Sequence, residues 1–470
     1  MHEPESADGA VVARRDAERA AGSRARAALR VLAAELFPDA VGAEFDPTRT
    51  AALAADASVA AVRDAAFASA GVEGRADFLV RESGGFGLRR VSAVLRPGET
   101  QLDELAFAHF AARRAGIAVS SVALLHLDAD FVRGAAPPSA RELLRHSDVT
   151  REVAPLARDL AARVAAQAAL LAAPAPAVEP SPHCRRPDTC AFLPRCTAGL
   201  PPDWIGQLPG LRPQHFAALR DLGVARMGEV PADFPLTPAQ RNAIASLGRG
   251  APFAAGELAA ALACCAAGAD FLDFEAIMPE VPLYPGTKAY EPVPFQWSAH
   301  LHRAGGELAH AGFLAETGAD PRREFARSLL AAFADRALPV AVYSGFESDV
   351  LAALARVFPD LAADLDALRA RLFDLLPVLR RSVYHPDFRG SFSLKRVAPA
   401  LAPGFGFADL PGIADGGAAA RAWHALARGE LAPAAAARAL DELRAYCARD
   451  SLALARVLDA LRELAAQSSP

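Results

Sequence analysis

FLDFEAI, residues 271–277, places two carboxylates, Asp273 and Glu275, among large apolar side chains. A short apolar run of this kind predicts a buried strand. Residues two apart on a strand point to the same face, so Asp273 and Glu275 would project together, with Phe274 on the opposite face. Two like charges side by side in a buried position are costly unless a positive charge neutralises them. Divalent Mg²⁺ or Mn²⁺ suits such oxygen ligands, and the alternative is an acidic strand end that faces solvent.

The sequence around this stretch predicts one α/β domain over residues 267–470. Further strands are expected at residues 295–303, 310–316 and 338–345, and helices at residues 324–336 and 347–358. The amphipathic run LDELRAYCARDSLALARVLDALREL, residues 440–464, predicts a long closing helix. Strands first, then alternating helices and strands, indicate a mixed sheet flanked by helices.

Four more candidate site residues lie in this domain. Glu347 follows a predicted strand in YSGFESD, and Asp374 stands among apolar residues in RLFDLLPVL. Tyr446 and Asp450 are four residues apart in the closing helix, so they share one helical face.

The order of these motifs resembles that of the DEDD exonucleases of the RNase H-like superfamily, in their tyrosine-bearing (DEDDy) form. More closely, FLDFEAIMPEVPLYPGTKAYEPVPFQWSAHL, residues 271–301, resembles the bacterial domain of unknown function 2779 family. Members of that family join such a domain to a RecB-like nuclease region. The resemblance implies a two-metal-ion 3′→5′ exonuclease that hydrolyses phosphodiester bonds of DNA or RNA, in particular at a single-stranded 3′ end.

By this resemblance Asp273, Glu275, Glu347 and Asp450 would hold two Mg²⁺ or Mn²⁺ ions about 4 Å apart. One ion would activate water and the other would stabilise the leaving 3′-oxygen, while Tyr446 would orient the attacking water. The sequence departs from the family at the second motif, where Glu347 stands in place of Asp.

Three further residues could support this site, and each of them has an alternative role. Asp374 could supply the second-motif ligand in place of Glu347, could support the site from outside, or could cap a helix or form a buried salt bridge. Gln296 could hydrogen-bond the substrate or a metal-bound water, or be a satisfied core amide. Lys395, in GSFSLKRV, matches the family pattern and could contact phosphate, or be solvated.

Residues 1–182 resemble a RecB-like PD-(D/E)XK nuclease, which implies a restriction-endonuclease-like α/β fold. GRADFLV and LRRVSAVLR predict two strands joined by the turn ESGGFG, and Asp77 matches the first acid of that family. Arg90 and Ser92 stand where the family has Glu and Lys, and His109 stands where it has Gln. The expected domain is therefore degenerate and catalytically dead, and an unrelated α/β domain is the alternative.

Residues 183–200 form a cysteine segment, in which His183 precedes Cys184, Cys190 and Cys196 at C-x5-C-x5-C spacing. Related nucleases hold a [4Fe–4S] cluster with one more, N-terminal cysteine, which this chain lacks. The site would then bind an Fe–S cluster or Zn²⁺ with His183 or a remote residue as fourth ligand, or would be degenerate.

Residues 201–266 predict a helical connector. LPGLRPQHFAALRDLGV, residues 208–224, is similar to a helix-hairpin-helix unit, whose turn can hold a nucleic-acid phosphate on backbone N–H groups. A plain connector between domains is the alternative.

Composition limits the remaining possibilities. A chain of 470 residues predicts two or three domains, and a net charge of −5 excludes a strongly basic nucleic-acid coat but not a local basic groove. The N-terminal MHEPESADGAVVARRD is unlike a signal peptide, and no apolar run reaches transmembrane length, so a cytoplasmic protein is expected. The alternatives to an exonuclease are an inactive nucleic-acid-binding or scaffold protein and a phosphoesterase of small nucleotides.

Overall fold

The computed structural model describes residues 22, 24–174, 176, 178–185, 189–303, 305–410 and 412–468. The N-terminal stretch that argued against a signal peptide lies entirely outside these residues. Contacts divide the chain into two compact units. Unit 1 is Met1–Glu179 with Met278–Glu291, and unit 2 is Pro180–Ile277 with Pro292–Pro470.

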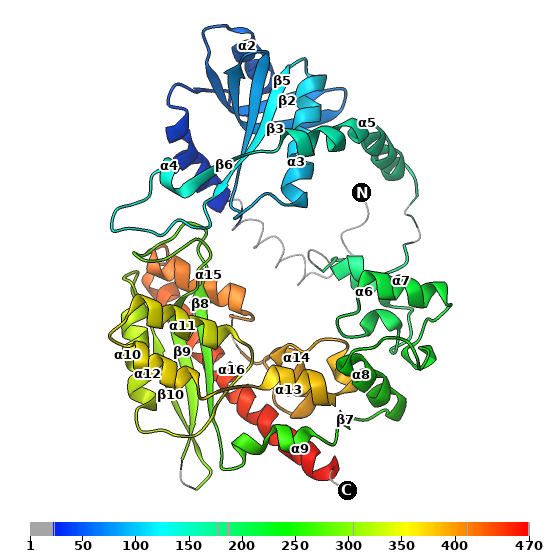
Figure 1. The fold of residues 1–470 in the computed structure, drawn as a ribbon, viewed down its shortest axis with the longest axis vertical. Coiled ribbons are helices and arrows are strands. Elements are labelled where there is room, and N and C mark those ends of the chain that lie inside the picture. Colours follow the sequence, from blue (N-terminus) through cyan, green and yellow to red (C-terminus); the bar gives the residue numbers. More distant parts are fainter. Residues whose placement is uncertain are drawn as a thin grey trace. The chain divides into compact units, whose positions relative to one another are not determined.

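Unit 1 is built on a six-stranded sheet in which the strands lie in chain order (Figure 1). The strands are β1 (Val41–Gly42), β2 (Ala61–Ser69), β3 (Val72–Glu82), β4 (Gly85–Ser92), β5 (Val119–Leu127) and β6 (Leu144–Asp148). The predicted turn at ESGGFG joins β3 to β4 as an antiparallel pair. β4 and β5 are parallel, which requires a crossover, and α3 (Glu99–Arg114) provides it.

Helices cover this sheet. α3 and α5 (Thr150–Ala172) bury leucines and alanines against it, and α2 (Pro47–Ala55) and α4 (Ala140–Leu143) complete the unit. The close packing of α3 depends on Gly74 of β3, where a Cβ atom would collide with the Cβ of Ala111. Any side chain at position 74 would push this helix away from the sheet.

Residues Met278–Glu291, between two strands of unit 2, belong to unit 1. Ala289 lies in an apolar cluster with Leu29 and Phe78, and the hydroxyl of Tyr290 donates to the carbonyl of Ala93. Arg133 donates to the carbonyl of Pro282 at 2.8 Å. Backbone and side-chain contacts therefore fix this segment to the N-terminal sheet.

Unit 2 contains a five-stranded sheet in the order β10–β9–β8–β11–β12. The strands are β8 (Asp270–Ile277), β9 (Val293–His302), β10 (Leu308–Leu314), β11 (Val340–Val342) and β12 (Leu372–Asp374). β8, β9 and β10 are antiparallel neighbours, whereas β11 is parallel to both β8 and β12. The expected mixed sheet and α/β class are confirmed.

Two apolar layers sandwich this sheet. Leu272 and Phe274 face α10 (Arg322–Phe333), and α11 (Phe346–Val357) and α12 (Ala362–Arg369) lie on the same side. Phe271 packs on the other side against α16 (Pro433–Ser468). Since residues alternate along a strand, Asp273 and Glu275 share the α16 side with Phe271.

The remaining elements of unit 2 are short. They are η3 (Pro182–Arg185), α6 (Leu193–Thr197), η4 (Ile205–Gln207), α7 (Pro213–Asp221), η5 (Met227–Glu229), α8 (Pro238–Arg249), β7 (Phe253–Ala254), α9 (Leu258–Ala261), η6 (Ala263–Cys265), α13 (Leu375–Ser382), β13 (Val383–Tyr384), η7 (Pro386–Phe388), α14 (Leu394–Leu401) and α15 (Gly416–Ala427). The expected connector is packed within this unit, because β7 pairs with β13 and Asn242 donates to the carbonyl of Arg381 at 2.8 Å. Among the described residues, none of the helices combines the length and the apolar character needed to cross a membrane.

Candidate metal centre

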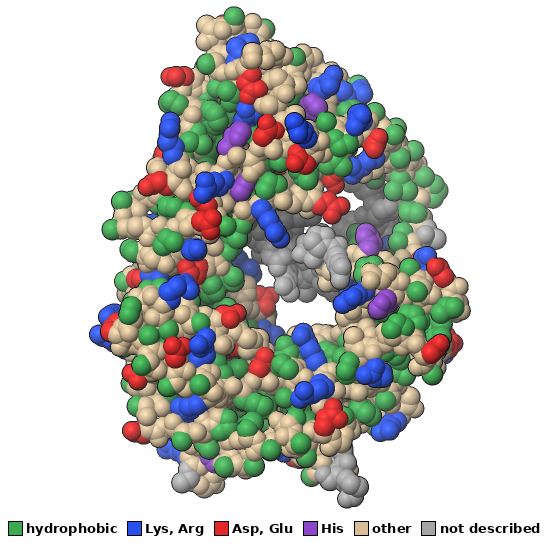
Figure 2. Space-filling view, in the orientation of Figure 1, with side chains coloured by type: hydrophobic (Ala, Val, Ile, Leu, Met, Phe, Trp, Pro, Cys, Tyr) green, Lys and Arg blue, Asp and Glu red, His purple; other side chains and the backbone are tan. Residues whose placement is uncertain are grey.

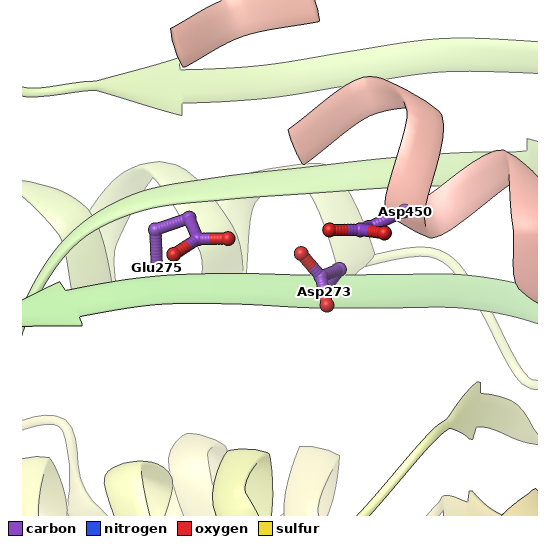
Figure 3. Close-up of side chains that lie close together, drawn as sticks. All are labelled: Asp273, Glu275 and Asp450. Atoms are coloured by element: carbon purple, nitrogen blue, oxygen red, sulfur yellow. The ribbon is translucent and has the colours of Figure 1, made fainter. Parts of the chain in front are cut away.

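Three carboxylates from distant parts of the sequence meet on the α16 side of the sheet. Asp273 and Glu275 rise from β8, and Asp450 points toward them from α16 (Figure 3). One oxygen of each residue lies within 4.8 Å of the others, and Glu275 and Asp450 are only 8% and 6% exposed. The expectation that Asp273 and Glu275 share a face, and that Asp450 faces the core, matches this geometry.

Helix α16 presents Asp450 to the sheet because its apolar residues recur on the same face. Ala453, Leu454 and Val457 are three, four and seven residues beyond Asp450, and all are buried. Tyr446 lies one turn before Asp450, and its hydroxyl hydrogen-bonds the Asp450 carboxylate.

Burial and mutual repulsion hold these carboxyl groups partly protonated when no cation is present. Burial and the charge of Asp450 raise the pKa of Glu275 to about 8, and the nearby Lys395 partly opposes them. Burial raises the pKa of Asp450 to about 6, against the effect of Lys395 and of the Tyr446 hydroxyl. The pKa of Asp273 rises well above its usual value, because of burial and the charges of Asp450 and Glu275. Displacing these protons would require a strong positive charge.

Glu347 adds a fourth carboxylate from the first turn of α11. It is 4% exposed, and it accepts hydrogen bonds from the backbone of Phe274 and the side chain of Ser344. Burial raises its pKa to about 8, and its charge contributes to the raised pKa of Asp273. Glu347 lies outside the group of three, but close enough for its charge to act on that group.

Asp374 has a structural role. Its side chain caps α13, accepting from the backbone N–H of Leu376 at 2.9 Å, as one of the sequence alternatives had it. It lies at the end of β12, and its charge also raises the pKa of Glu347.

Three buried oxygens at this centre accept no hydrogen bond from any described residue. They are Oδ1 of Asp450, Oε2 of Glu347 and Oε1 of Gln296. Buried acceptors are nearly always satisfied, so these unpaired oxygens are positions where a cation could bind. The donor set is all oxygen, which fits Mg²⁺ or Mn²⁺ better than Zn²⁺ or copper.

Lys395 places a positive charge beside the carboxylates and contacts Tyr446. The Lys395 ammonium donates to the Tyr446 hydroxyl at 2.5 Å and to the carbonyl of Ala414 at 2.6 Å. It also lies 4.3 Å from the centroid of the Tyr446 ring. Burial and the three neighbouring carboxylates raise the pKa of Tyr446, so its hydroxyl keeps its proton.

Gln296 stands opposite Glu275 in the β8–β9 register. Its amide donates to the carbonyl of Leu443 in α16 at 2.8 Å, which leaves its own oxygen unpaired. The NH₂ group of Gln296 is therefore satisfied within the core, whereas Oε1 accepts no hydrogen bond from the described residues and lies on the strand position opposite Glu275.

Sequence reasoning missed two neighbours of the centre. The thiol of Cys447 lies 3.4 Å from Oδ2 of Asp273, and burial raises its pKa. Asp415 caps α15, and a Cβ at the following Gly416 would lie 3.5 Å from Glu275. The Asp-Gly-Gly before an Ala-rich run was a signal for a helix start, but nothing in it pointed to Glu275.

Two candidate residues of unit 1, Asp77 and Arg90, form ion pairs with other residues of that unit. Asp77 is 2% exposed, and its carboxylate accepts from Arg26 at 2.9 Å and from the backbone N–H of Val91 at 2.7 Å, with Arg30 at 3.1 Å. Arg90 pairs with Glu104 at 2.9 Å. Two arginines thus supply the positive charge that a metal would supply to Asp77.

Ser92 and His109 complete the comparison with the RecB-like pattern. Ser92 is the last residue of β4. His109 lies on α3 with its Nδ1 buried and unpaired among the described residues, and burial with the charge of Arg113 lowers its pKa. Neither Ser92 nor His109 therefore supplies the carboxylate that the RecB-like site would need besides Asp77.

The cysteine segment has no comparable convergence. Cys184, Cys190 and Cys196 are free thiols of intermediate exposure. Within the described ranges, no three of these thiols and His183 bring their ligand atoms within 4.8 Å of one another. The Fe–S or Zn²⁺ site stays a prediction.

Comparison with known families places one part of the chain. Residues 270–393 match the family model described as a domain of unknown function, DUF2779. The match includes Asp273, Glu275 and Glu347 but ends before Lys395, Tyr446 and Asp450. No curated protein and no solved structure matches the chain.

Proposed function

We propose that unit 2 is a two-metal-ion 3′→5′ exonuclease that hydrolyses phosphodiester bonds of DNA or RNA. The observation that carries this proposal is the cluster of Asp273, Glu275 and Asp450, in which Oδ1 of Asp450 accepts no hydrogen bond from any described residue. The strand order β10–β9–β8–β11–β12, in which only β9 is antiparallel to both of its neighbours, supports an RNase H-like fold. Helix α16 brings the last acid across this sheet, as in the tyrosine-bearing exonucleases.

The charges of the site are consistent with two divalent cations. The carboxylates of Asp273, Glu275, Glu347 and Asp450 together carry four negative charges when ionised, which two such ions would balance. Bound Mg²⁺ or Mn²⁺ would lower the pKa of a water molecule and stabilise charge on the leaving oxygen. The carboxylates themselves would fix the positions of these charges, since each is held by the sheet or by a buried helix face.

Tyr446 and Lys395 would orient the reactants. The Tyr446 hydroxyl is held between the Lys395 ammonium and the Asp450 carboxylate, where it can position an attacking water by a hydrogen bond. The Lys395 ammonium places one positive charge beside the carboxylates, where it can contact a substrate phosphate. Neither group needs to exchange a proton for these roles, because the environment of Tyr446 keeps it neutral.

We further propose that unit 1 is a degenerate RecB-like domain with a restriction-endonuclease-like fold. The pairing of Asp77 with Arg26 and Arg30 supports this proposal, because the one remaining acid of the motif is already neutralised. Unit 1 would then contribute stability or binding, and not hydrolysis.

The test is release of mononucleotides from a 3′-end-labelled, 5′-blocked oligonucleotide in Mn²⁺. We expect the wild-type protein to release them, chelator to stop release, and Asp273→Asn to remove nearly all activity. Glu324→Gln, an exposed acid on α10, is the matched control and should behave as wild type. If the wild-type protein binds the oligonucleotide but releases nothing, and Asp273→Asn behaves identically, the chain is an inactive binding protein.

A further inference from the structure

A large pocket in unit 2 is separate from the carboxylate cluster. Its volume is about 1020 Å³. Its walls come from the connector at Pro209, Gly210 and Thr237, from the end of α13, and from the turn at residues 390–394. The pocket therefore lies where the predicted helix-hairpin-helix turn meets the C-terminal domain.

The charged residues that line the pocket, among those the structure describes, are all arginines. Arg185, Arg380 and Arg381 are exposed, and no described Asp or Glu lines the pocket. No ion pair joins these three guanidinium groups to a carboxylate of the described residues, although the charge of Arg380 partly opposes the burial that raises the pKa of Asp374. Other arginines of the unit are paired, such as Arg449 with Asp409 at 2.8 Å. Figure 2 shows Lys and Arg side chains over the region of α13 and α8. Three unpaired cations around one cavity favour an anionic ligand.

The walls of the pocket are held in place by buried contacts. The side-chain amide of Gln240, 2% exposed, donates to the carbonyl of Pro209 at 3.0 Å, and Asn242 donates to the carbonyl of Arg381. Gly390 has φ +79° and packs so closely on the carbonyl of Gln207 that a Cβ would collide with it. The connector and the arginine-bearing helix thus form one rigid surface.

Uncharged groups of the pocket also suit a phosphodiester strand. Helices α8 and α14 begin after Thr237 and Ser393, and both residues line the pocket, so the positive ends of two helices lie at its wall. Tyr343, Phe392 and Leu376 add apolar surface that sugars and bases can cover.

Two chain segments connect the wall of the pocket to the carboxylate cluster. Tyr343 follows β11 and precedes Glu347 by four residues, and its hydroxyl donates to the carbonyl of Phe392 at 2.8 Å. Leu394 lines the pocket, while the next residue, Lys395, contacts Tyr446 in the centre. The first residues of α14 therefore take part in both sites.

We propose that this pocket binds the phosphodiester backbone of the substrate strand, upstream of the 3′ end that reaches the carboxylates. The inference rests on the proposed nuclease function and names its substrate as a polymer, not a small nucleotide. Arginine forks recognise phosphate in bidentate fashion without reading the base, so binding is independent of sequence.

The experiment compares two substrates that differ in length. The variant Arg380→Gln/Arg381→Gln removes two cations, and Arg327→Gln/Arg369→Gln, on α10 and α12, is the matched control. Affinity for 3-nucleotide and 12-nucleotide single strands of oligo-dT and oligo-U is measured with Ca²⁺ in place of Mn²⁺. Hydrolysis of the p-nitrophenyl ester of thymidine 5′-phosphate, which has no upstream strand, is measured in Mn²⁺.

We expect the variant to bind the 12-mer roughly tenfold to a hundredfold more weakly, and its log–log salt dependence to become shallower by about 1.4. Binding of the 3-mer, hydrolysis of the ester and the circular dichroism spectrum should not change. Equal affinity of variant and wild type for the 12-mer would overturn the inference, as would an equal loss in the control pair. Failure of the wild-type protein to hydrolyse the ester would instead contradict the proposed nuclease function. The binding comparison would still test the pocket, because it is measured without hydrolysis.

Discussion

The variant Glu275→Gln should make the metal-free protein more stable, although it removes a proposed ligand. Burial and the charge of Asp450 raise the pKa of Glu275 from 4.5 to about 8 in the folded state. The folded protein therefore keeps a proton that the unfolded chain releases. For a carboxyl group whose pKa is raised by folding, stability is complete below pH 4.5 and is lost as the pH rises toward 8.

The size of this loss follows from the same values. At pH 7, which is 2.5 pH units above the ordinary value of 4.5, the loss is about 3 kcal/mol, at about 1.4 kcal/mol per pH unit. Glutamine has the size of a protonated glutamate and does not titrate. The free energy of unfolding of Glu275→Gln should exceed that of wild type by about 2–3 kcal/mol at pH 7, and by almost nothing at pH 4.5.

The assay is urea unfolding followed by tryptophan fluorescence, after chelator treatment. All three tryptophans, Trp204, Trp297 and Trp423, lie in unit 2, so the signal reports the unit that contains the site. Glu324→Gln serves as the control and should show no pH-dependent difference. Mn²⁺ at about a thousand times its Kd should reverse the order, because it would stabilise wild type by about 4.1 kcal/mol, which exceeds the advantage of the variant.

A Glu275→Gln protein that is no more stable than wild type at pH 7 in chelator would refute the reasoning. It would mean that the carboxylates do not repel one another in the folded state, and that no cation is needed to hold them together. Stabilisation at pH 7 without any response to Mn²⁺ would support the repulsion but not the metal site.

Three more expectations concern the site and unit 1. Tyr446→Phe should leave Mn²⁺ affinity unchanged. In the mononucleotide-release assay it should slow turnover by one to three orders of magnitude, about 1.4–4 kcal/mol of transition-state stabilisation. An unchanged rate would show that Tyr446 does not orient the attacking water. Mn²⁺ affinity should rise by roughly a hundredfold or more between pH 6 and pH 8, because Glu275 and Glu347, each with a pKa of about 8, must lose their protons. Calorimetry in two buffers of different ionisation enthalpy measures the number of protons released on Mn²⁺ binding. A release of zero protons would contradict the prediction. Asp77→Ala should destabilise unit 1 by about 3 kcal/mol, because it removes the carboxylate that pairs with Arg26 and one of the two that pair with Arg30. Hydrogen exchange in β3 and β4 should accelerate, whereas equal exchange would show that the pairs are not needed.

Local patterns in the sequence determined several features of this protein. The alternation in FLDFEAI placed Asp273 and Glu275 on one face, and the four-residue spacing placed Tyr446 beside Asp450, since both periods depend only on backbone geometry. The turn at ESGGFG and the strands on each side of it were also predictable, because glycines with positive φ, Gly84 and Gly85, mark a tight turn.

Only the tertiary structure decided how these pieces act together. Asp450 reaches β8 because α16 buries an apolar face against the sheet. That packing depends on side chains from several other elements and not on the local sequence of α16. The same burial raises the pKa values of the carboxyl groups, which no spacing can reveal. The contact of Lys395 with Tyr446, the capping role of Asp374 and the seating of Met278–Glu291 in unit 1 likewise depend on long-range contacts. A single sequence specifies which residues share a face, whereas the distance between faces is set only when the whole core is packed.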